Sequence, residues 1–161
     1  GIGLLLYKAA EDRNNGLSAE KIAANIEKNA KLVLSQFAIE TMEYLHKGGR
    51  CSGVARFFGT MLKIKPIIGV RNGKMSVIKK PIGKMKVALD AMINQIIGDK
   101  DRLDRSRIFV THSLAFDYCD YIKSKLEVEF PGVEIITTVA GCVISSHCGK
   151  GTIGILYMVK E

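Results

Sequence analysis

Long apolar runs are absent from this chain: none approaches the roughly 20 residues that a membrane-spanning helix needs. The opening GIGLLLYKAA also lacks the basic leader and the small-residue cleavage site of a secretory signal peptide. It has the pattern of a helix from its first residues, yet it contains neither a methionine nor a capping residue. We therefore expect a cytoplasmic protein without membrane insertion, and a segment taken from a longer chain.

The chain also lacks the closely spaced cysteine pairs of a typical zinc site. None of the four cysteines forms a C-x2-C pair, although Cys142, His147 and Cys148 are close in sequence. A structural zinc site needs a full tetrahedral set of ligands, and in an extended chain adjacent side chains such as His147 and Cys148 point to opposite faces. Without a signal peptide, thiols are favoured over disulfides. The sequence predicts no metal site and no cofactor.

Acidic residues are outnumbered, which gives the chain a net charge of +8. A cluster of lysines contributes much of this charge: Lys74, Lys79, Lys80, Lys84 and Lys86. Such a cluster could attract nucleic acid, an anionic membrane or an acidic protein, or it could be a solvated hairpin and helix face. No aromatic residue interrupts the lysines to stack on bases, and no known nucleic-acid motif is found. We therefore predict no nucleic-acid partner.

What the chain does have is the composition of one globular domain, with 47% hydrophobic and 25% charged residues. Asn72-Gly73 between two apolar runs is typical of a tight β-hairpin, and Ser18 suits the start of a helix. Strands are expected over residues 32–39, 66–80 (the hairpin), 107–113, 133–141 and 151–160. Helices are expected up to residue 14, after residue 18, and over residues 40–49, 52–64, 83–97 and 114–130. The alternation predicts an α/β (α+β) fold over residues 1–161, with a mixed or mainly antiparallel sheet covered by helices.

The stretch ISSHCGKG, residues 144–151, is the main candidate site. It fails as a phosphate loop because the Walker pattern requires a glycine where Ile144 stands and a helix after the loop. Nucleophilic catalysis is disfavoured because neighbours along an extended chain do not face each other and no orienting carboxylate is near. Two interpretations remain equally open: an anion-binding loop, or a turn with a satisfied histidine. In the first, His147 and Ser146 supply donors, and Gly149 lets backbone N–H groups approach the anion.

A second candidate is the corner Gly48-Gly49-Arg50. Two glycines here deliver a guanidinium into a tight loop, and arginine is well suited to holding a carboxylate. Helix termination alone would explain the glycines but not the arginine. His112 is expected to cap the helix that follows it, and His46 to lie on a helix surface.

Three segments together resemble the C-terminal half of DegV-family proteins. They are YLHKGGRCSGVARFFGTMLKIKPII, NGKMSVIKK and GCVISSHCGKGTIGI, in this order and spacing. The resemblance covers essentially the whole chain. It implies a two-domain bacterial protein that encloses a long-chain fatty acid between its halves and presents it to a partner kinase, for acyl-phosphate formation in phospholipid metabolism. It also implies that the protein is not an enzyme, and that the N-terminal half is absent from this chain.

By the same resemblance, Arg50 and His147 lie near the fatty-acid carboxylate. The anion-binding interpretation of the loop adds Ser146 and Gly149 to this site. The chain departs from the family pattern at Cys51, Lys150 and Ile82; Ile82 stands where the family often has an arginine implicated in kinase docking. Met85, Leu89, Phe57 and Phe58 are candidates for the tunnel wall, although core packing explains most such residues. Two alternatives stay open: an enzyme that uses His147 as acid or base, and a partner- or nucleic-acid-binding module that uses the lysines.

Overall fold

Six strands form a single mixed sheet in the computed structural model, which describes residues 1–49, 64–71 and 73–160. The strands are β1 (Val33–Ala38), β2 (Ile67–Arg71), β3 (Lys74–Lys79), β4 (Arg107–Ser113), β5 (Glu134–Val139) and β6 (Thr152–Met158). Their order across the sheet is β3-β2-β1-β6-β4-β5. All neighbours are antiparallel except β4 and β5, which are parallel. The predicted mixed, mainly antiparallel sheet is therefore confirmed.

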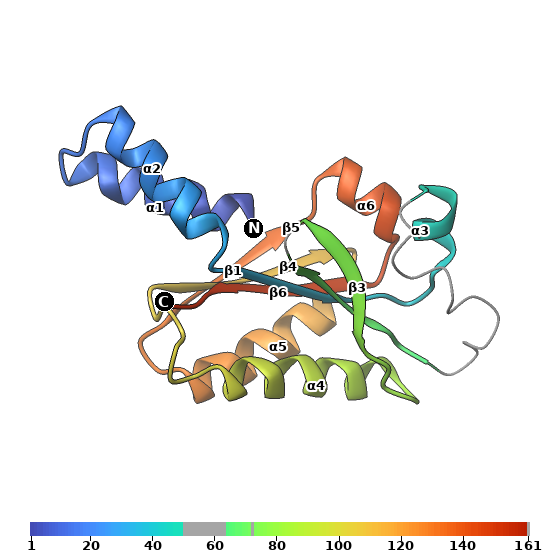
Figure 1. The fold of residues 1–161 in the computed structure, drawn as a ribbon. Helices are drawn as coiled ribbons and strands as arrows, with labels where there is room; N and C mark the ends of the chain where they lie inside the picture. The colour runs from blue at the N-terminus through green and yellow to red at the C-terminus, as the bar shows by residue number, and fades with distance from the viewer. Residues whose placement is uncertain (50–63, 72, 161) are drawn as a thin grey trace.

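Helices cover both faces of this sheet (Figure 1). They are α1 (Ile2–Asn14), α2 (Ala19–Ala30), α3 (Glu43–Lys47), α4 (Met85–Gly98), α5 (Phe116–Glu129) and α6 (Cys142–Cys148). Helices α4 and α5 lie under one face, whereas the α1–α2 pair and the α3–α6 pair stand over opposite ends of the other. The helix expected over residues 52–64 falls outside the described residues except for Ile64, which forms an isolated bridge with Ile82.

The main core lies between the sheet and the helices α4 and α5. Alternate residues of the strands point down into it, as period-two side-chain geometry requires. The fully buried members include Ile67, Leu89, Met92, Ile96, Ile108, Val110, Ile122, Leu126, Ile153 and Ile155. Two of the proposed tunnel-wall residues, Met85 and Leu89, are part of this core, on the side of the sheet away from α6.

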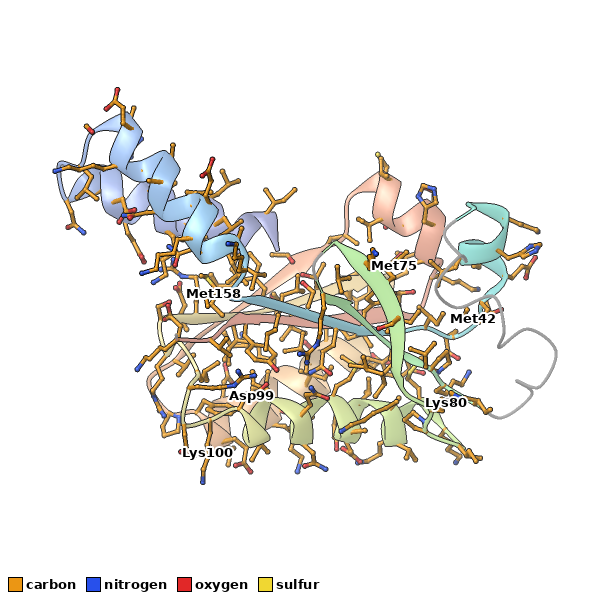
Figure 2. All side chains as sticks on the ribbon, viewed as in Figure 1. Met42, Met75, Lys80, Asp99, Lys100 and Met158 are labelled. Atoms are coloured by element: carbon orange, nitrogen blue, oxygen red, sulfur yellow. The ribbon has the colours of Figure 1, made fainter. Side chains whose placement is uncertain are left out.

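Two smaller clusters lie on the opposite face. One joins α1 to the sheet through Leu4, Phe109 and Met158, and the other joins α3 and α6 to it through Met42, Leu45 and Ile68, among others. Figure 2 shows Met158 on the α1–α2 side and Met42 on the α3 side. Between them, no helix among the described residues covers this face (Figure 1).

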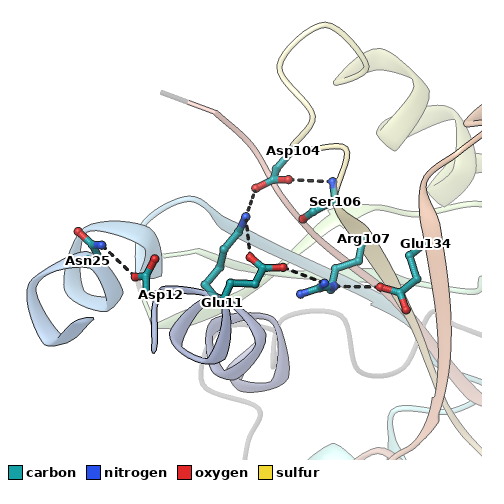
Figure 3. A network of polar contacts seen from close by, with 8 residues as sticks. Glu11, Asp12, Asn25, Asp104, Ser106, Arg107 and Glu134 are labelled. Atoms are coloured by element: carbon teal, nitrogen blue, oxygen red, sulfur yellow. Dashed lines mark hydrogen bonds and ion pairs between the residues drawn. The ribbon is translucent and has the colours of Figure 1, made fainter. Parts of the chain in front are cut away.

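Polar contacts complete the attachment of α1 (Figure 3). Arg107 on β4 makes ion pairs with Glu11 of α1 and Glu134 of β5, at 2.9 and 3.2 Å. Its guanidinium carbon lies 4.1 Å from the centre of the Tyr7 ring. Lys8 makes an ion pair with Asp104 at 2.9 Å. A short helix with one fully buried leucine is thus held by charge as well as by apolar contact.

One short helix was not predicted. Residues 142–148 were considered as an extended chain or a turn, but they form helix α6, with Gly141 before it and Gly149 after it. Its serine hydroxyls donate to nearby carbonyls: Ser146 Oγ to Val143 O within the helix at 2.9 Å, and Ser145 Oγ to Ala140 O just before it at 3.1 Å. Serine side chains compete with the helical hydrogen bonds for backbone groups and therefore usually favour turns. The two serines thus gave no sequence signal for this short helix, which tertiary contacts stabilise.

Candidate ligand-binding site

Helices α3 and α6 bring the two candidate motifs together at one end of the sheet (Figure 1). They share a small apolar cluster in which Leu45 of α3 is fully buried and Cys148 of α6 is nearly so. Burial raises the pKa of the Cys148 thiol, so this cysteine is a protonated packing residue. Cys119, Cys142 and Cys148 are all free.

His147 packs directly on the glycine corner. A methyl group added to Gly48 would overlap the His147 ring, so this contact requires glycine at residue 48. Helix α3 ends at this corner with Gly49 in the left-handed region at φ +67°, and the Gly49 N–H donates to His46 O. Arg50 follows immediately but lies outside the described residues, so its predicted role stays a prediction.

The His147 ring is oriented by its own helix. Its Nδ1 lies 2.7 Å from the carbonyl oxygen of Val143, one turn earlier. Because a carbonyl only accepts, Nδ1 carries the proton in this bond, and in the neutral ring Nε2 is then an acceptor. Protonation of the ring would turn Nε2 into a donor, which is the state that suits a carboxylate ligand.

Ser146 and Gly149 frame this histidine. Ser146 is exposed, and its hydroxyl donates to Val143 O within the helix; to donate to a carboxylate ligand, the hydroxyl would have to rotate away from that carbonyl. Gly149 has φ +82°, and a Cβ there would overlap the Tyr44 ring. Its N–H donates to Ser145 O at 2.8 Å, and the Gly151 N–H donates to Ser113 O at 2.7 Å. In this conformation both amides donate within the chain, and the contact of Gly149 with an anion stays a prediction.

A cleft of about 620 Å³ lies between α3, the start of α5 and the loop that follows α6. It is lined by Glu40, Thr41, Glu43, Tyr44, Leu114, Ala115, Phe116, Asp117, Tyr118, Lys150 and Gly151. At its base the Tyr118 hydroxyl donates to Glu40 at 3.1 Å, and Lys65 makes an ion pair with the same carboxylate. Burial, and then the nearby Glu40 carboxylate, raise the pKa of Tyr118, which keeps it a hydrogen-bond donor.

Sequence reasoning missed this Glu40–Lys65–Tyr118 network. Its members are up to 78 positions apart, and no spacing or motif links them. The role of His112 was predicted: its Nδ1 accepts from the Ala115 N–H at 3.3 Å, at the start of α5. This bond helps to shape the rim of the cleft.

The geometry does not resemble a hydrolytic site. Nδ1 of His147 faces a backbone carbonyl, where a catalytic triad would place a carboxylate. Within the described part of the chain, no three His, Cys, Asp or Glu side chains gather as metal ligands. Nor is any helix in residues 1–49, 64–71 and 73–160 long and apolar enough to cross a membrane.

Comparisons with known proteins match the whole described fold. A family model described as "Uncharacterised protein, DegV family" matches residues 1–160. A DegV domain-containing protein of Clostridium acetobutylicum is 32% identical over 160 residues, which are 99% of this chain and 55% of that protein. The chain therefore spans about half the length of the curated relatives it matches.

Solved structures of DegV-family proteins have the same fold as this chain. DegV of Bacillus subtilis, described as a fatty acid binding protein, is 30% identical with a TM-score of 0.80; the match covers 98% of this chain and 56% of that one. The fatty acid kinase (Fak) B3 protein of Streptococcus pneumoniae, solved loaded with linoleic acid, has a TM-score of 0.85. It is 19% identical, with 99% of this chain and 56% of that one covered, and this likeness concerns the fold alone.

Proposed function

The chain belongs to the DegV family, and on that premise we propose that residues 1–161 are the C-terminal half of a two-domain protein that binds a long-chain fatty acid. The length of the curated relatives supports this reading, because the chain accounts for about 55% of the Clostridium acetobutylicum protein. A solved relative that is 30% identical is described as a fatty acid binding protein. We further propose a cytoplasmic location for the protein.

The contact between His147 and Gly48 is the observation that carries the proposal. Two motifs almost 100 residues apart in the sequence meet there; one was a candidate for anion binding and the other contains an arginine suited to a carboxylate. The Nδ1 bond to Val143 fixes the ring and leaves Nε2 for a ligand. We assign the head group to His147, Ser146 and Arg50, with Gly149 shaping the loop behind them.

Exposed apolar side chains support the proposal that a second half packs over this face. Ile2 and Leu6 on α1, and Val143 and Ile144 on α6, are between 55% and 77% exposed. Both helices stand on the face opposite α4 and α5 (Figure 1). Apolar groups gathered on one side of a protein mark an interaction surface, and a covering domain would bury them around a fatty acid.

In this reading the protein is a carrier and performs no chemistry itself. Its finer role is to present the fatty acid to a partner kinase for acyl-phosphate formation. Ile82 stands where the family often has an arginine implicated in kinase docking, and its apolar side chain cannot form an ion pair with such a partner.

Mass spectrometry of the full-length protein after mild purification provides the test. We expect long-chain fatty acids to co-purify, and His147→Ala to lower the bound fraction roughly tenfold, the effect of losing one charge-assisted hydrogen bond. His46→Ala, which removes an exposed histidine on α3, is the matched control. Ligand-free protein, or an equal loss in both variants, would count against the proposal.

A further inference from the structure

Positive charge is segregated along this chain. Residues 44–89 contain eleven lysines and arginines and no aspartate or glutamate. This stretch has a formal charge of +11, so the remainder carries −3 of the total of +8. The described part of the stretch is centred on the β2–β3 hairpin and the start of α4.

The turn from β3 to α4 combines this charge with exposed apolar groups. Lys79, Lys80 and Lys84 are exposed, and between them Ile82 is 70% exposed; Val87, on the first turn of α4, is 47% exposed. Figure 2 shows Lys80 where β3 gives way to α4. We call these five residues the basic tip.

The backbone holds the basic tip in place. The Lys65 N–H donates to Pro81 O at 2.9 Å, and Ile82 forms an isolated bridge with Ile64. On the far side, Met85 is buried in the main core. Ile82 is thus presented to solvent by an anchored turn, which makes its exposure a feature of the fold and not of a loose end.

Lys86 belongs to a different arrangement. Its ammonium group lies 3.0 Å from Asp90 Oδ2 and donates to the Tyr121 hydroxyl at 2.5 Å. Asp90 therefore balances the charge of Lys86 within α4. Lys79, Lys80 and Lys84 carry the positive charges of the basic tip itself. Lys79 donates to the Ala91 carbonyl at 3.4 Å, a neutral acceptor that leaves the charge of the lysine in place.

We propose that the basic tip docks on an anionic lipid bilayer, with its lysines at the headgroup phosphates and Ile82 and Val87 in the interfacial layer. Clustered lysines are attracted to anionic leaflets, and an apolar group at their centre adds burial that a nucleic acid would not provide. Residues 74–87 contain no aromatic side chain to stack on bases. Lysine, a point charge on a flexible stem, also suits a fluid array of phosphates better than a fixed acidic partner.

This docking is peripheral and goes beyond the fatty-acid proposal. It depends on charge and exposure at one turn, away from His147, and would hold if the ligand were something else. For a fatty-acid carrier it would place the protein at the surface where such ligands are found.

Co-sedimentation of the full-length protein with vesicles tests the proposal. Vesicles of phosphatidylglycerol and phosphatidylcholine are compared with vesicles of phosphatidylcholine alone, at low and high salt. The triple variant Lys79→Gln, Lys80→Gln, Lys84→Gln should bind the anionic vesicles on the order of a hundredfold more weakly at low salt. Ile82→Ser should weaken binding about tenfold and leave the salt dependence unchanged.

Two matched controls share these changes in chemistry. Lys21→Gln, Lys100→Gln, Lys125→Gln removes the same charge from exposed positions elsewhere, and Val128→Ser removes an apolar group that is 78% exposed on α5. Both should bind as the unmodified protein does.

The proposal is overturned by absent binding at low salt, by equal binding to phosphatidylcholine, or by an equal loss in the control triple. Tighter binding to duplex DNA or to a polyglutamate peptide would overturn it too, in favour of those partners. The fatty-acid content of the same preparations is measured separately, so a failure here is distinguishable from a failure of the carrier proposal.

Discussion

Two glycines of this chain share a left-handed backbone but differ in their surroundings. Gly149, at the end of α6, has φ +82°, and Gly16, after α1, has φ +77°. Nothing lies within 4 Å of the place where a Cβ of Gly16 would be, whereas a Cβ at Gly149 would overlap the Tyr44 ring. The pair therefore separates backbone strain from close packing at the candidate site.

Gly149→Ala should lower the free energy of unfolding by roughly 2–4 kcal/mol, from left-handed strain and overpacking together. Gly16→Ala should lower it by about 1 kcal/mol, from strain alone. Denaturant titration measures both. Tyr44→Ala in the Gly149→Ala background should recover part of the loss, since it removes the clashing ring. Equal effects of the two glycine variants would show that the Tyr44 contact is unimportant.

At the scale of elements, local patterns predicted most of the fold. The strand over residues 107–113 was found with the bounds of β4, and Ser18 does cap α2, accepting from the Lys21 N–H at 3.5 Å. The hairpin is also confirmed in β2 and β3, where Arg71 pairs with Lys74 and Gly73 has φ +71°. These signals act within a few residues and so can be read from sequence.

Helix α6 could not be found in this way. Seven residues give too short a window for helical periodicity, and CVISSHC is rich in residues that favour turns or strands. The helix exists because Cys148 is buried against α3 and the His147 ring packs on Gly48, almost 100 residues away. The two motifs of the candidate site were thus found in the sequence, and resemblance to the family linked them to a fatty-acid carboxylate, while the shape of the site came only from tertiary structure.

The attachment of α1 makes a prediction at the same scale. Arg107→Met keeps an apolar stem beside Tyr7 but removes both ion pairs of the guanidinium. We expect local opening of α1 and α2 to become easier by roughly 1–2 kcal/mol, the usual range for one cation–π contact and exposed ion pairs. Amide hydrogen exchange over residues 2–30 should then quicken about tenfold, while β1 and β6 stay protected.

Arg13→Met is the control for this variant. Arg13 is exposed on the same helix, and its guanidinium donates to the neighbouring Asn14 at 3.2 Å. Arg13→Met should therefore leave amide hydrogen exchange over residues 2–30 unchanged. Faster exchange throughout the sheet in Arg107→Met would instead mean that Arg107 stabilises the whole core, and not only the attachment of α1 and α2.

At the scale of the whole molecule, the sheet joins segments whose pairing no local pattern indicates. Strand β6 lies between β1 and β4, so the end of the chain forms the centre of the sheet. The sequence predicted a mixed sheet, but not this order, because strand order depends on which apolar faces meet after collapse. The consequence for function is that His147, on α6, directly precedes one of the two central strands of the sheet.

Acid should destabilise the whole molecule through carboxylates that tie its elements together. Burial alone would raise the pKa of Asp104, but hydrogen bonds from Ser106 and the Lys8 ammonium outweigh it and set the pKa below the usual value. The Tyr121 hydroxyl, and then Lys86, likewise lower the pKa of Asp90. A carboxyl with a lower pKa in the folded than in the unfolded state stabilises the fold above its unfolded pKa, and this contribution is lost as pH falls through the folded pKa.

The free energy of unfolding should therefore be flat from neutral pH to about pH 5 and should fall as the pH drops below about 4, where unfolded aspartate takes up its proton. Asp104→Asn should lower the free energy of unfolding at pH 7. It should also make the fall of that free energy below about pH 4 less steep, because one titrating group is gone. Asp101→Asn, at an exposed position without an ion pair among the described residues, should leave the curve in place. Denaturant titrations across this pH range measure both slopes. If Asp104→Asn kept the full slope of the unmodified protein, the link from α1 to the sheet through Lys8 and Asp104 would contribute nothing to acid stability, and the attachment would have to rest on Leu4, Tyr7 and Arg107.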